Sequence, residues 1–279
     1  WNMRRNKHRI KQLSLYLAVL TLFLFASCGT EPEREDQVVS ERAVELFNLG
    51  IASYQEENFS GESRAYAVLK KTGEEAGSYG SYLQMTRGLY RNDQEEPAFR
   101  LSVRGFINSP MPGEVDWEKN TPLYECYLRD GISVYDYEGE ENDYKVAFAG
   151  DYLSHIGLYA ISEQMPNRFY AISDGKSARI DLTFNADRVY RLEGAFIQMM
   201  NLALFGGGVD LTYSDLTVSA LLDEEEGRFT EYTVTFAGTM KQDPSLRVEY
   251  TYFERFFDYG TEEEIAFPDF EKVPLKEVK

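Results

Sequence analysis

Histidine and cysteine are nearly absent from this chain, which contains two of each in 279 residues. So few ligands argue against a zinc cluster and against a framework of disulfide bonds. Positive charge is also scarce, because 29 Lys and Arg stand against 47 Asp and Glu, a formal net charge of −18. Nucleic-acid binding needs clustered basic residues that neutralise phosphates, so this composition argues against a nucleic-acid partner.

Sequence motifs of common enzyme classes are also missing, including G-x-S-x-G, H-E-x-x-H and Walker A. Ser173 and Lys176 have the S-x-x-K spacing of penicillin-binding enzymes, and Lys71 begins a K-T-G triplet. That mechanism needs Ser and Lys one helical turn apart, whereas the intervening Asp174-Gly175 predicts a hairpin turn. The two motifs also stand in the reverse of the enzyme order. We therefore predict a protein that is not an enzyme and has no cofactor.

Three further features have a plain structural interpretation. Cys126 alternates with Tyr124 and Leu128 on one strand face, which predicts a small buried hydrophobe. The glycines at 206–208 lack the Lys and Ser or Thr of a phosphate loop, so we expect a helix stop and hinge. Acidic clusters occur at 138–143, 223–226 and 262–264. None matches a calcium loop, so we interpret them as solvated turn charge and predict no metal site.

The N-terminus has the pattern of a bacterial signal peptide. Five basic residues lie between Arg4 and Lys11, and a mostly apolar run of 14 residues follows from Leu13 to Ala26. At ~1.5 Å per residue this run is too short to cross a hydrocarbon layer of ~30 Å as a helix. We expect residues 1–27 to be a signal peptide.

The apolar run ends in Phe25-Ala26-Ser27-Cys28, which resembles the lipobox of bacterial lipoproteins. The resemblance implies that Cys28 is acylated, for example with palmitate, and that lipid anchors the protein to the extracytoplasmic face of the cell membrane. The family usually has Leu where this chain has Phe25. An ordinary secretory signal and an uncleaved anchor are the alternatives. The acidic composition and the single remaining cysteine favour a Gram-positive host.

The rest of the chain begins with a tether and helical segments. Residues 28–37 are acidic and contain proline, so we expect a flexible tether. Residues 38–62 form a predicted helical extension, in which apolar residues such as Leu46, Phe47 and Ile51 recur at spacings of three and four. A shorter helix is expected over about 62–76.

From about Tyr79 the apolar residues alternate, as they do in strands with one wet face. In one run Phe99, Leu101, Val103 and Ile107 share a face, opposite Arg100, Ser102 and Arg104. The same alternation is found over 216–222, 232–240 and 246–252. Glycine-containing turns separate consecutive runs, a pattern typical of an antiparallel sheet.

Two helices are predicted to interrupt the strands. Asp151 is positioned to cap a helix that ends at Met165, and Asp187 to cap another that ends near Leu204. The predicted fold is α+β: one large curved antiparallel sheet, a half-barrel, whose concave apolar face is covered by helices. An amphipathic sheet that helices cover only in part would leave a cavity.

The C-terminal strands resemble those of LolA-like lipoproteins, a group that includes uncharacterised Gram-positive proteins. The resemblance rests on the paired runs 229–236 and 248–253, followed by Asp258-Tyr259-Gly260 and a segment ending in Pro268. It covers roughly residues 65–270, within a predicted LolA-like domain of residues 63–279. The helix before residue 62 is a departure from the family. The resemblance implies a half-barrel, closed by helices, that holds an apolar ligand without catalysis.

The sequence thus supports two hypotheses of function. The first is a lipid-anchored envelope protein that binds a lipid or another apolar molecule between sheet and helices. The second is an envelope sensor or interaction protein that uses the LolA-like fold as a scaffold for a protein partner. For the first, we expect the helix that follows Asp187 to act as a lid. The predicted ligand-binding residues are Leu192, Phe196, Met199, Met200, Leu204, Tyr232, Val234 and Phe236.

Overall fold

The computed structural model describes seven stretches of the chain, and all of them belong to one compact unit, Asp36–Lys279. The predicted signal peptide, Cys28 and the acidic cluster at 138–143 lie outside the described residues, as do residues 151–159. No helix in the described stretches is long and apolar enough to cross a membrane. The described stretches are 37–72, 77–92, 98–107, 124–130, 132–137, 144–147 and 160–273.

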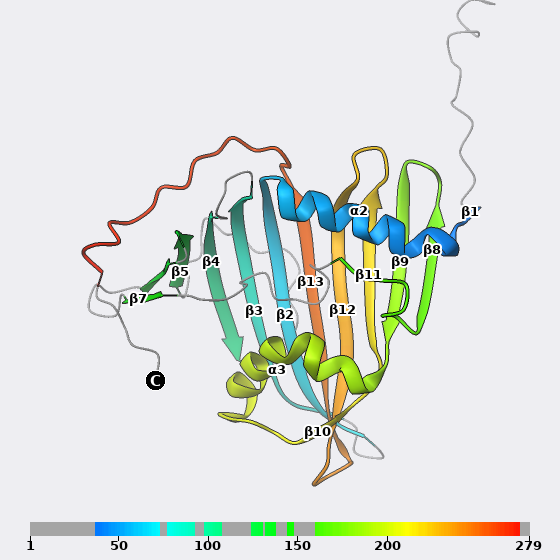
Figure 1. The fold of residues 1–279 in the computed structure, drawn as a ribbon. Helices are drawn as coiled ribbons and strands as arrows, with labels where there is room; N and C mark the ends of the chain where they lie inside the picture. Colours follow the sequence, from blue (N-terminus) through cyan, green and yellow to red (C-terminus); the bar gives the residue numbers. More distant parts are fainter. Residues whose placement is uncertain are drawn as a thin grey trace, which may run out of the picture. The chain divides into compact units, whose positions relative to one another are not determined.

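One antiparallel sheet dominates the described residues (Figure 1). Its strands follow the order β1-β8-β9-β11-β12-β13-β2-β3-β4-β5-β6-β7, and β10 pairs with one end of β12. The strand bounds are β1 Gln37–Val38, β2 Phe59–Lys71, β3 Gly77–Arg91, β4 Ala98–Ile107, β5 Tyr124–Arg129, β6 Ile132–Tyr137, β7 Tyr144–Ala147, β8 Arg168–Ser173, β9 Ser177–Phe184, β10 Leu211–Tyr213, β11 Leu216–Asp223, β12 Arg228–Met240 and β13 Leu246–Phe257.

Two α-helices, α2 (Ala43–Glu56) and α3 (Val189–Phe205), cross the same face of this sheet (Figure 1). We call this side the inner face. Each helix begins with a short 3-10 turn, η1 (Ser40–Arg42) before α2 and η3 (Ala186–Arg188) before α3. α2 contacts β8, β9, β11 and β12, whereas α3 contacts β2 and β3 near the other end of the strands. The predicted α+β class, an antiparallel sheet with helices on its apolar face, is confirmed.

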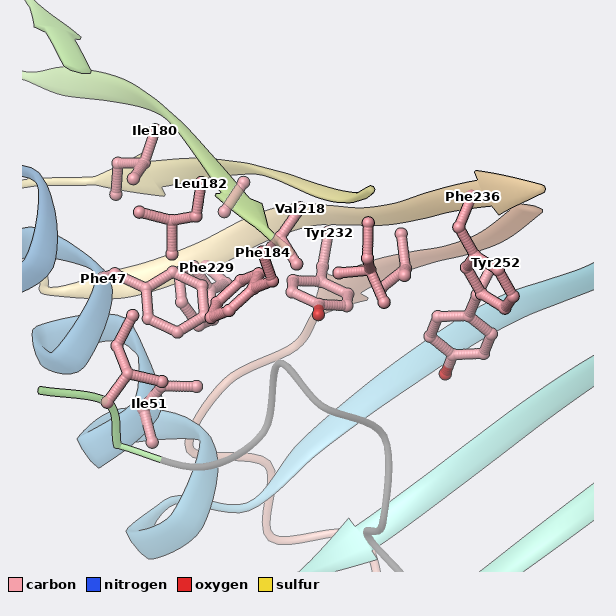
Figure 2. Close-up of a cluster of buried hydrophobic side chains, with 14 of the residues drawn as sticks. Phe47, Ile51, Ile180, Leu182, Phe184, Val218, Phe229, Tyr232, Phe236 and Tyr252 are labelled. Carbon is pink, nitrogen blue, oxygen red and sulfur yellow. The ribbon is translucent and has the colours of Figure 1, made fainter. Parts of the chain in front are cut away.

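The amphipathic pattern of α2 explains where it lies. Its buried residues are those with the spacing of three and four noted in the sequence, among them Leu46, Phe47 and Ile51 at 1% exposure each. They pack against Ile180 and Leu182 of β9 and against Phe229 of β12 (Figure 2). The backbone N–H of Glu57 donates to Ser53 and ends the helix, and β2 begins two residues later.

The predicted helix over 62–76 is wrong where the structure describes it, because residues 62–71 belong to β2, and residues 73–76 lie outside the described residues. Strand β13 pairs with β2 on one side and β3 pairs with it on the other, so its backbone groups are hydrogen-bonded along nearly its whole length. Ala, Glu, Arg and Lys favour helices in isolation. Pairing on two edges outweighs that preference, which amounts to only a few tenths of a kcal/mol per residue.

The alternation predicted for β11, β12 and β13 is confirmed. Leu216, Val218, Ala220 and Leu222 are all buried, and so are the inward-facing residues of β12 and β13 except Met240 and Leu246, which are partly buried near the strand ends. The turns also behave as expected, since Gly227 has φ of +68° between β11 and β12. In β4 the prediction fails at two places. Arg104, expected on a wet face, is 5% exposed, and Ile107, expected on the apolar face, is 73% exposed at the strand end.

The second predicted pair of helices is partly corrected. The helix expected to end at Met165 does not extend to that residue, because 160–165 is irregular with a turn between Ser162 and Met165. α3 is present, but Asp187 does not cap it, since it lies within η3 and Arg188 occupies the N-cap position without a side-chain capping bond. The glycine stop is confirmed, because Gly206 follows α3 in the left-handed region with φ of +71°.

Beyond β13 the chain extends along the sheet to β5 and β6 (Figure 1). Phe270 is buried there at 8% exposure against Tyr127 and Val134. The guanidinium of Arg129 lies 5.0 Å and 4.8 Å from the ring centroids of Phe267 and Phe270, a cation–π geometry. This small cluster, which contains no residue of α2 or α3, stabilises the β5–β6 side of the sheet.

Candidate functional site

The inner face between the two helices is built from alternate residues of β12 and β13. Tyr232, Val234 and Phe236 of β12 lie beside Tyr250 and Tyr252 of β13, and each is at most 6% exposed. The rings of Phe236 and Tyr250 stack with centroids 4.8 Å apart. The strands therefore present a buried wall of aromatic side chains to the helices, part of which is visible in Figure 2.

α3 closes this wall with one aromatic side chain. The ring of Phe196 meets Phe236, Tyr250 and Tyr252 edge-on, at centroid distances of 6.1, 6.2 and 6.2 Å. Such edge-to-face pairs add about 0.5–1.5 kcal/mol each to simple burial. Phe196 thus contacts the sheet together with Val189, Ile197 and Met200 of the same helix, which are 0–1% exposed in the same cluster.

All eight predicted ligand-binding residues belong to this one cluster, but their exposure differs. Phe196, Met200, Tyr232, Val234 and Phe236 are 0–5% exposed. A side chain that lines a cavity large enough for water retains accessible surface, so these five pack against protein in this conformation. The other three, Leu192, Met199 and Leu204, are only partly buried at the edge of the cluster. Ligand binding by these residues stays a prediction.

Next to the aromatic wall, β2 carries an inward row of small residues: Gly61, Ser63, Ala65 and Ala67. We call this row the small-residue lane. Phe59 and Leu69 occupy the next inward positions at its two ends, and β3 borders it with Tyr82, Gln84, Thr86 and Tyr90. Ala65 and Ala67 are 4% and 0% exposed, whereas Ser63, Gln84 and Thr86 are partly exposed. The lane is therefore covered at the α3 end and more open near its middle.

Buried polar groups interrupt the apolar interior, and the sequence pattern did not reveal them. Glu254 is 1% exposed and accepts a hydrogen bond of 2.7 Å from the Tyr252 hydroxyl. Burial, together with this carboxylate, holds the pKa of Tyr252 well above its usual value. Tyr250 donates to Asn201 of α3 at 2.6 Å. These groups add directional contacts to a wall that is mainly apolar.

The shape of α3 is irregular at both ends. Glu193, 1% exposed, has non-helical angles (φ −124°, ψ 20°), so the helix kinks after its first turn. At the other end a Cβ added to Gly206, Gly207 or Gly208 would meet no atom within 4 Å. The predicted hinge at these glycines thus has free space around it, although its motion stays a prediction.

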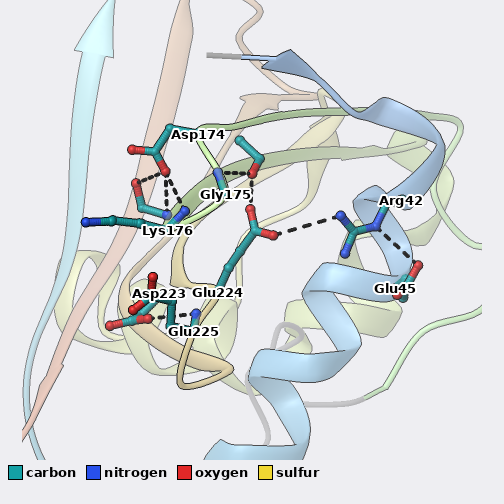
Figure 3. Close-up of polar contacts among 10 residues, drawn as sticks. Arg42, Glu45, Asp174, Gly175, Lys176, Asp223, Glu224 and Glu225 are labelled. Carbon is teal, nitrogen blue, oxygen red and sulfur yellow. Dashed lines mark hydrogen bonds and ion pairs between the residues drawn. The ribbon is translucent and has the colours of Figure 1, made fainter. Parts of the chain in front are cut away.

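Other candidate residues from the sequence have structural roles. Ser173 to Lys176 forms the β8–β9 turn, in which the N–H of Gly175 donates to Ser173 Oγ at 2.9 Å (Figure 3). The hairpin prediction is confirmed. Cys126 is a buried hydrophobe as expected, at 2% exposure, and burial raises the pKa of its thiol to about 12.

The acidic cluster at 223–226 forms a turn. Asp223 accepts from the N–H groups of Glu225 and Glu226, and Glu224 contacts Ser173 and Arg42 (Figure 3). The carboxylates of Asp223 and Glu224 are thus engaged by the protein itself, and that of Glu226 lies 3.2 Å from Arg228 Nη1. Among the residues with described positions, no group of His, Cys, Asp and Glu has the arrangement of a metal site.

Comparison with known proteins does not place the chain in a family. No family model matches it, and no curated protein matches it. Among solved structures, lipovitellin, from a study of its lipid–protein interactions, covers 76% of this chain at 5% identity with a TM-score of 0.39. The match spans about a quarter of the lipovitellin chain (26%).

Two further solved structures are similar at lower scores. The β-barrel-like DUF1849 protein from Brucella abortus is 11% identical over 71% of this chain and 96% of its own, with a TM-score of 0.22. The ywiB protein from Bacillus subtilis is 9% identical over 72% and 94%, with a TM-score of 0.15. At these scores the likenesses support no assignment of function, and the LolA-like resemblance stays a prediction.

Proposed function

We propose that this protein is a non-catalytic binding protein of the cell envelope, anchored by lipid at Cys28 on the extracytoplasmic face, that holds a lipid or another apolar molecule between its sheet and helices. The observation that carries the proposal is the small-residue lane of β2, bordered by tyrosines and covered by α3. At Ser63, Ala65 and Ala67 the small side chains leave room for a narrow apolar chain once the covering helix moves, whereas Glu254 Oε1 lies 3.2 Å from where a Cβ on Gly61 would be.

The dimensions and energies suit an acyl chain. Phe59 and Leu69 are ten residues apart, which corresponds to about 33 Å at ~3.3 Å per residue. Burial of ~12 CH₂ groups at ~0.8 kcal/mol each contributes about 10 kcal/mol before ordering costs. In this mechanism Phe196 leaves the aromatic wall as α3 lifts, and the ligand chain takes its place over Ala65 and Ala67.

The first test is native mass spectrometry of the protein purified from bacteria, with organic extraction of any bound molecule. We expect a lipid or similar apolar compound in near-stoichiometric amount. A clean apo mass that stays unchanged after incubation with envelope lipids would refute the proposal, and so would a ligand found to be a polar sugar or peptide.

The lid is tested separately through the glycines. Gly207→Ala/Gly208→Ala restricts the backbone without strain, because neither residue has a positive φ and both have open space. We expect slower uptake and release of a fluorescent fatty acid, measured by stopped-flow fluorescence, with little change in affinity. Unchanged rates would mean that α3 does not act as a lid.

A second candidate function is a sensor or interaction protein of the envelope. Close packing of five predicted ligand residues favours it, since a filled core needs no ligand. An apo mass together with in vivo crosslinking from the inner or outer face of the sheet to one envelope protein would support this second function.

A further inference from the structure

The segment from Gly194 to Val209 contains no charged residue, although 27% of the chain is charged. This is the longest uncharged run between residues 37 and 273. It includes most of α3 and the glycines after it. In a protein of net charge −18, the exposed residues of this run themselves contribute no repulsion toward an anionic lipid surface.

Part of this segment faces away from the core. Ala195, Gln198 and Leu202 recur at spacings of three and four and are exposed, and Phe205, three residues further along, is partly exposed. Leu202 is 63% exposed, among the highest values for a large apolar side chain in the described residues. We call this row, together with residues 206–209, the uncharged flank. Of its residues, Ala195 and Leu202 are exposed and apolar and Gln198 is exposed and polar, whereas Phe205 and Val209 also pack against the core.

A tyrosine pair lies near the N-terminal end of the same helix. Tyr190 is 51% exposed, its ring centroid lies 6.4 Å from that of Tyr213, and its hydroxyl accepts from Gln198. Tyrosine is enriched where protein meets the lipid–water boundary, because its ring is apolar and its hydroxyl polar.

From these observations we infer that the uncharged flank docks onto a lipid bilayer surface, with Leu202 inserted at the headgroup boundary. Amphipathic helices bind in this way through buried apolar area. The acidic remainder of the protein is repelled by anionic lipid, so the preferred surface is zwitterionic. This inference goes beyond the proposed function, since a bilayer contact requires no bound cargo. With this contact, the helix proposed as the lid would lie at the bilayer, from which a lipid ligand would enter.

The test uses the full-length chain with tryptophan as a local probe. Trp1 and Trp117 are first replaced by Phe, and Leu202→Trp is introduced. The matched control is Leu221→Trp, a 39% exposed leucine on the strand face opposite the inner face. Emission is measured with phosphatidylcholine vesicles whose acyl chains are brominated. Both proteins share the N-terminal apolar run, so any anchoring through that run affects them alike.

We expect bromine to quench the Leu202→Trp protein at least about threefold more than the control, as insertion at the headgroup boundary predicts. Added phosphatidylglycerol should weaken the quenching, and salt should restore it. Equal quenching of both proteins, or none, would overturn the inference. So would a concentration-dependent dimer abolished by Leu202→Asp, since a second copy would then occupy the flank. Selective quenching with an apo mass would refute only the cargo-binding function.

Discussion

The two helices on the inner face differ in how the rest of the protein holds them. α2 is fixed at both ends by polar contacts. Near its start Arg42 lies 3.9 Å from Glu224, and after its end Glu57 accepts three hydrogen bonds of 2.6–3.1 Å from Arg228. The next residue, Asn58, adds two contacts at this end of the helix: its side-chain amide donates to the Thr261 carbonyl and accepts from the N–H of Asn92.

α3 also makes polar contacts with neighbouring elements. Arg188 donates to the Met165 carbonyl before the helix, and Asn201 accepts from Tyr250 within it. The helix is kinked at Glu193 and ends in three glycines. From the kink and the glycines we expect that α3, rather than α2, is the helix that leaves the sheet in the proposed lid motion.

The largest expected loss of stability comes from removing a buried aromatic ring, and it should differ between the ring that packs against α2 and the ring that α3 itself contributes. Phe229→Ala removes a 0% exposed ring that packs on Phe47 at 5.5 Å under α2, and we expect a loss of about 3–5 kcal/mol. Phe196→Ala removes the corresponding ring of α3, and we expect less than half that loss, because α3 alone loosens. Urea unfolding followed by circular dichroism measures both. Equal losses would mean that the helices unfold together with the sheet.

A smaller effect on stability is expected when one methyl group is added at a glycine, in α2 for one variant and just after α3 for the other. A Cβ at Gly50 of α2 would lie 2.5 Å from the ring of Phe229, so Gly50→Ala should cost about 1–3 kcal/mol despite the higher helix propensity of alanine. The matched change Gly207→Ala has open space, and we expect a change within about 0.5 kcal/mol or a slight gain. Thermal melts of the two variants provide the comparison. A Gly50→Ala protein as stable as the parent would show that α2 shifts as readily as α3.

Sequence reasoning was most successful where hydrophobic contrast was strong. The alternation of Leu216, Val218, Ala220 and Leu222 against polar neighbours predicted β11, and the spacing of three and four predicted α2. β2 was missed because the usual pattern, with large apolar residues facing the core and polar residues facing solvent, is reversed in it. Its inward residues are small, as at Ala65 and Ala67, whereas outward positions carry larger residues. Only the pairing with β13 and β3 makes it a strand, and pairing is not visible in one segment.

For the candidate site, too, the apolar features could be predicted from the sequence and the others could not. Apolar periodicity grouped Phe196, Met200 and the β12 residues correctly into one cluster. It did not predict that Glu193 and Glu254 would be buried with them, since a charged residue within an apolar run is normally assigned to the solvent side. The small-residue lane was missed for the same reason as β2. A pattern of alternating Gly, Ser and Ala beside aromatic strands is the signal that would have indicated it.

The smallest effect concerns the contact that fixes the end of α2. The hydrogen bond from Arg228 lowers the pKa of Glu57, so the carboxylate is favoured in the folded state. A lowered folded-state pKa contributes stability that is fully present above the unfolded pKa of ~4.3 and is lost as pH falls through the folded value. Both side chains are partly exposed, and we expect Glu57→Gln to cost about 1 kcal/mol at pH 7 and almost nothing at pH 3.

Arg188→Met, before α3, should show no such pH dependence because its acceptor is a backbone carbonyl. Urea midpoints of the three proteins between pH 3 and 7 test this, and a pH-independent cost for Glu57→Gln would show that the contact holds α2 through packing rather than charge.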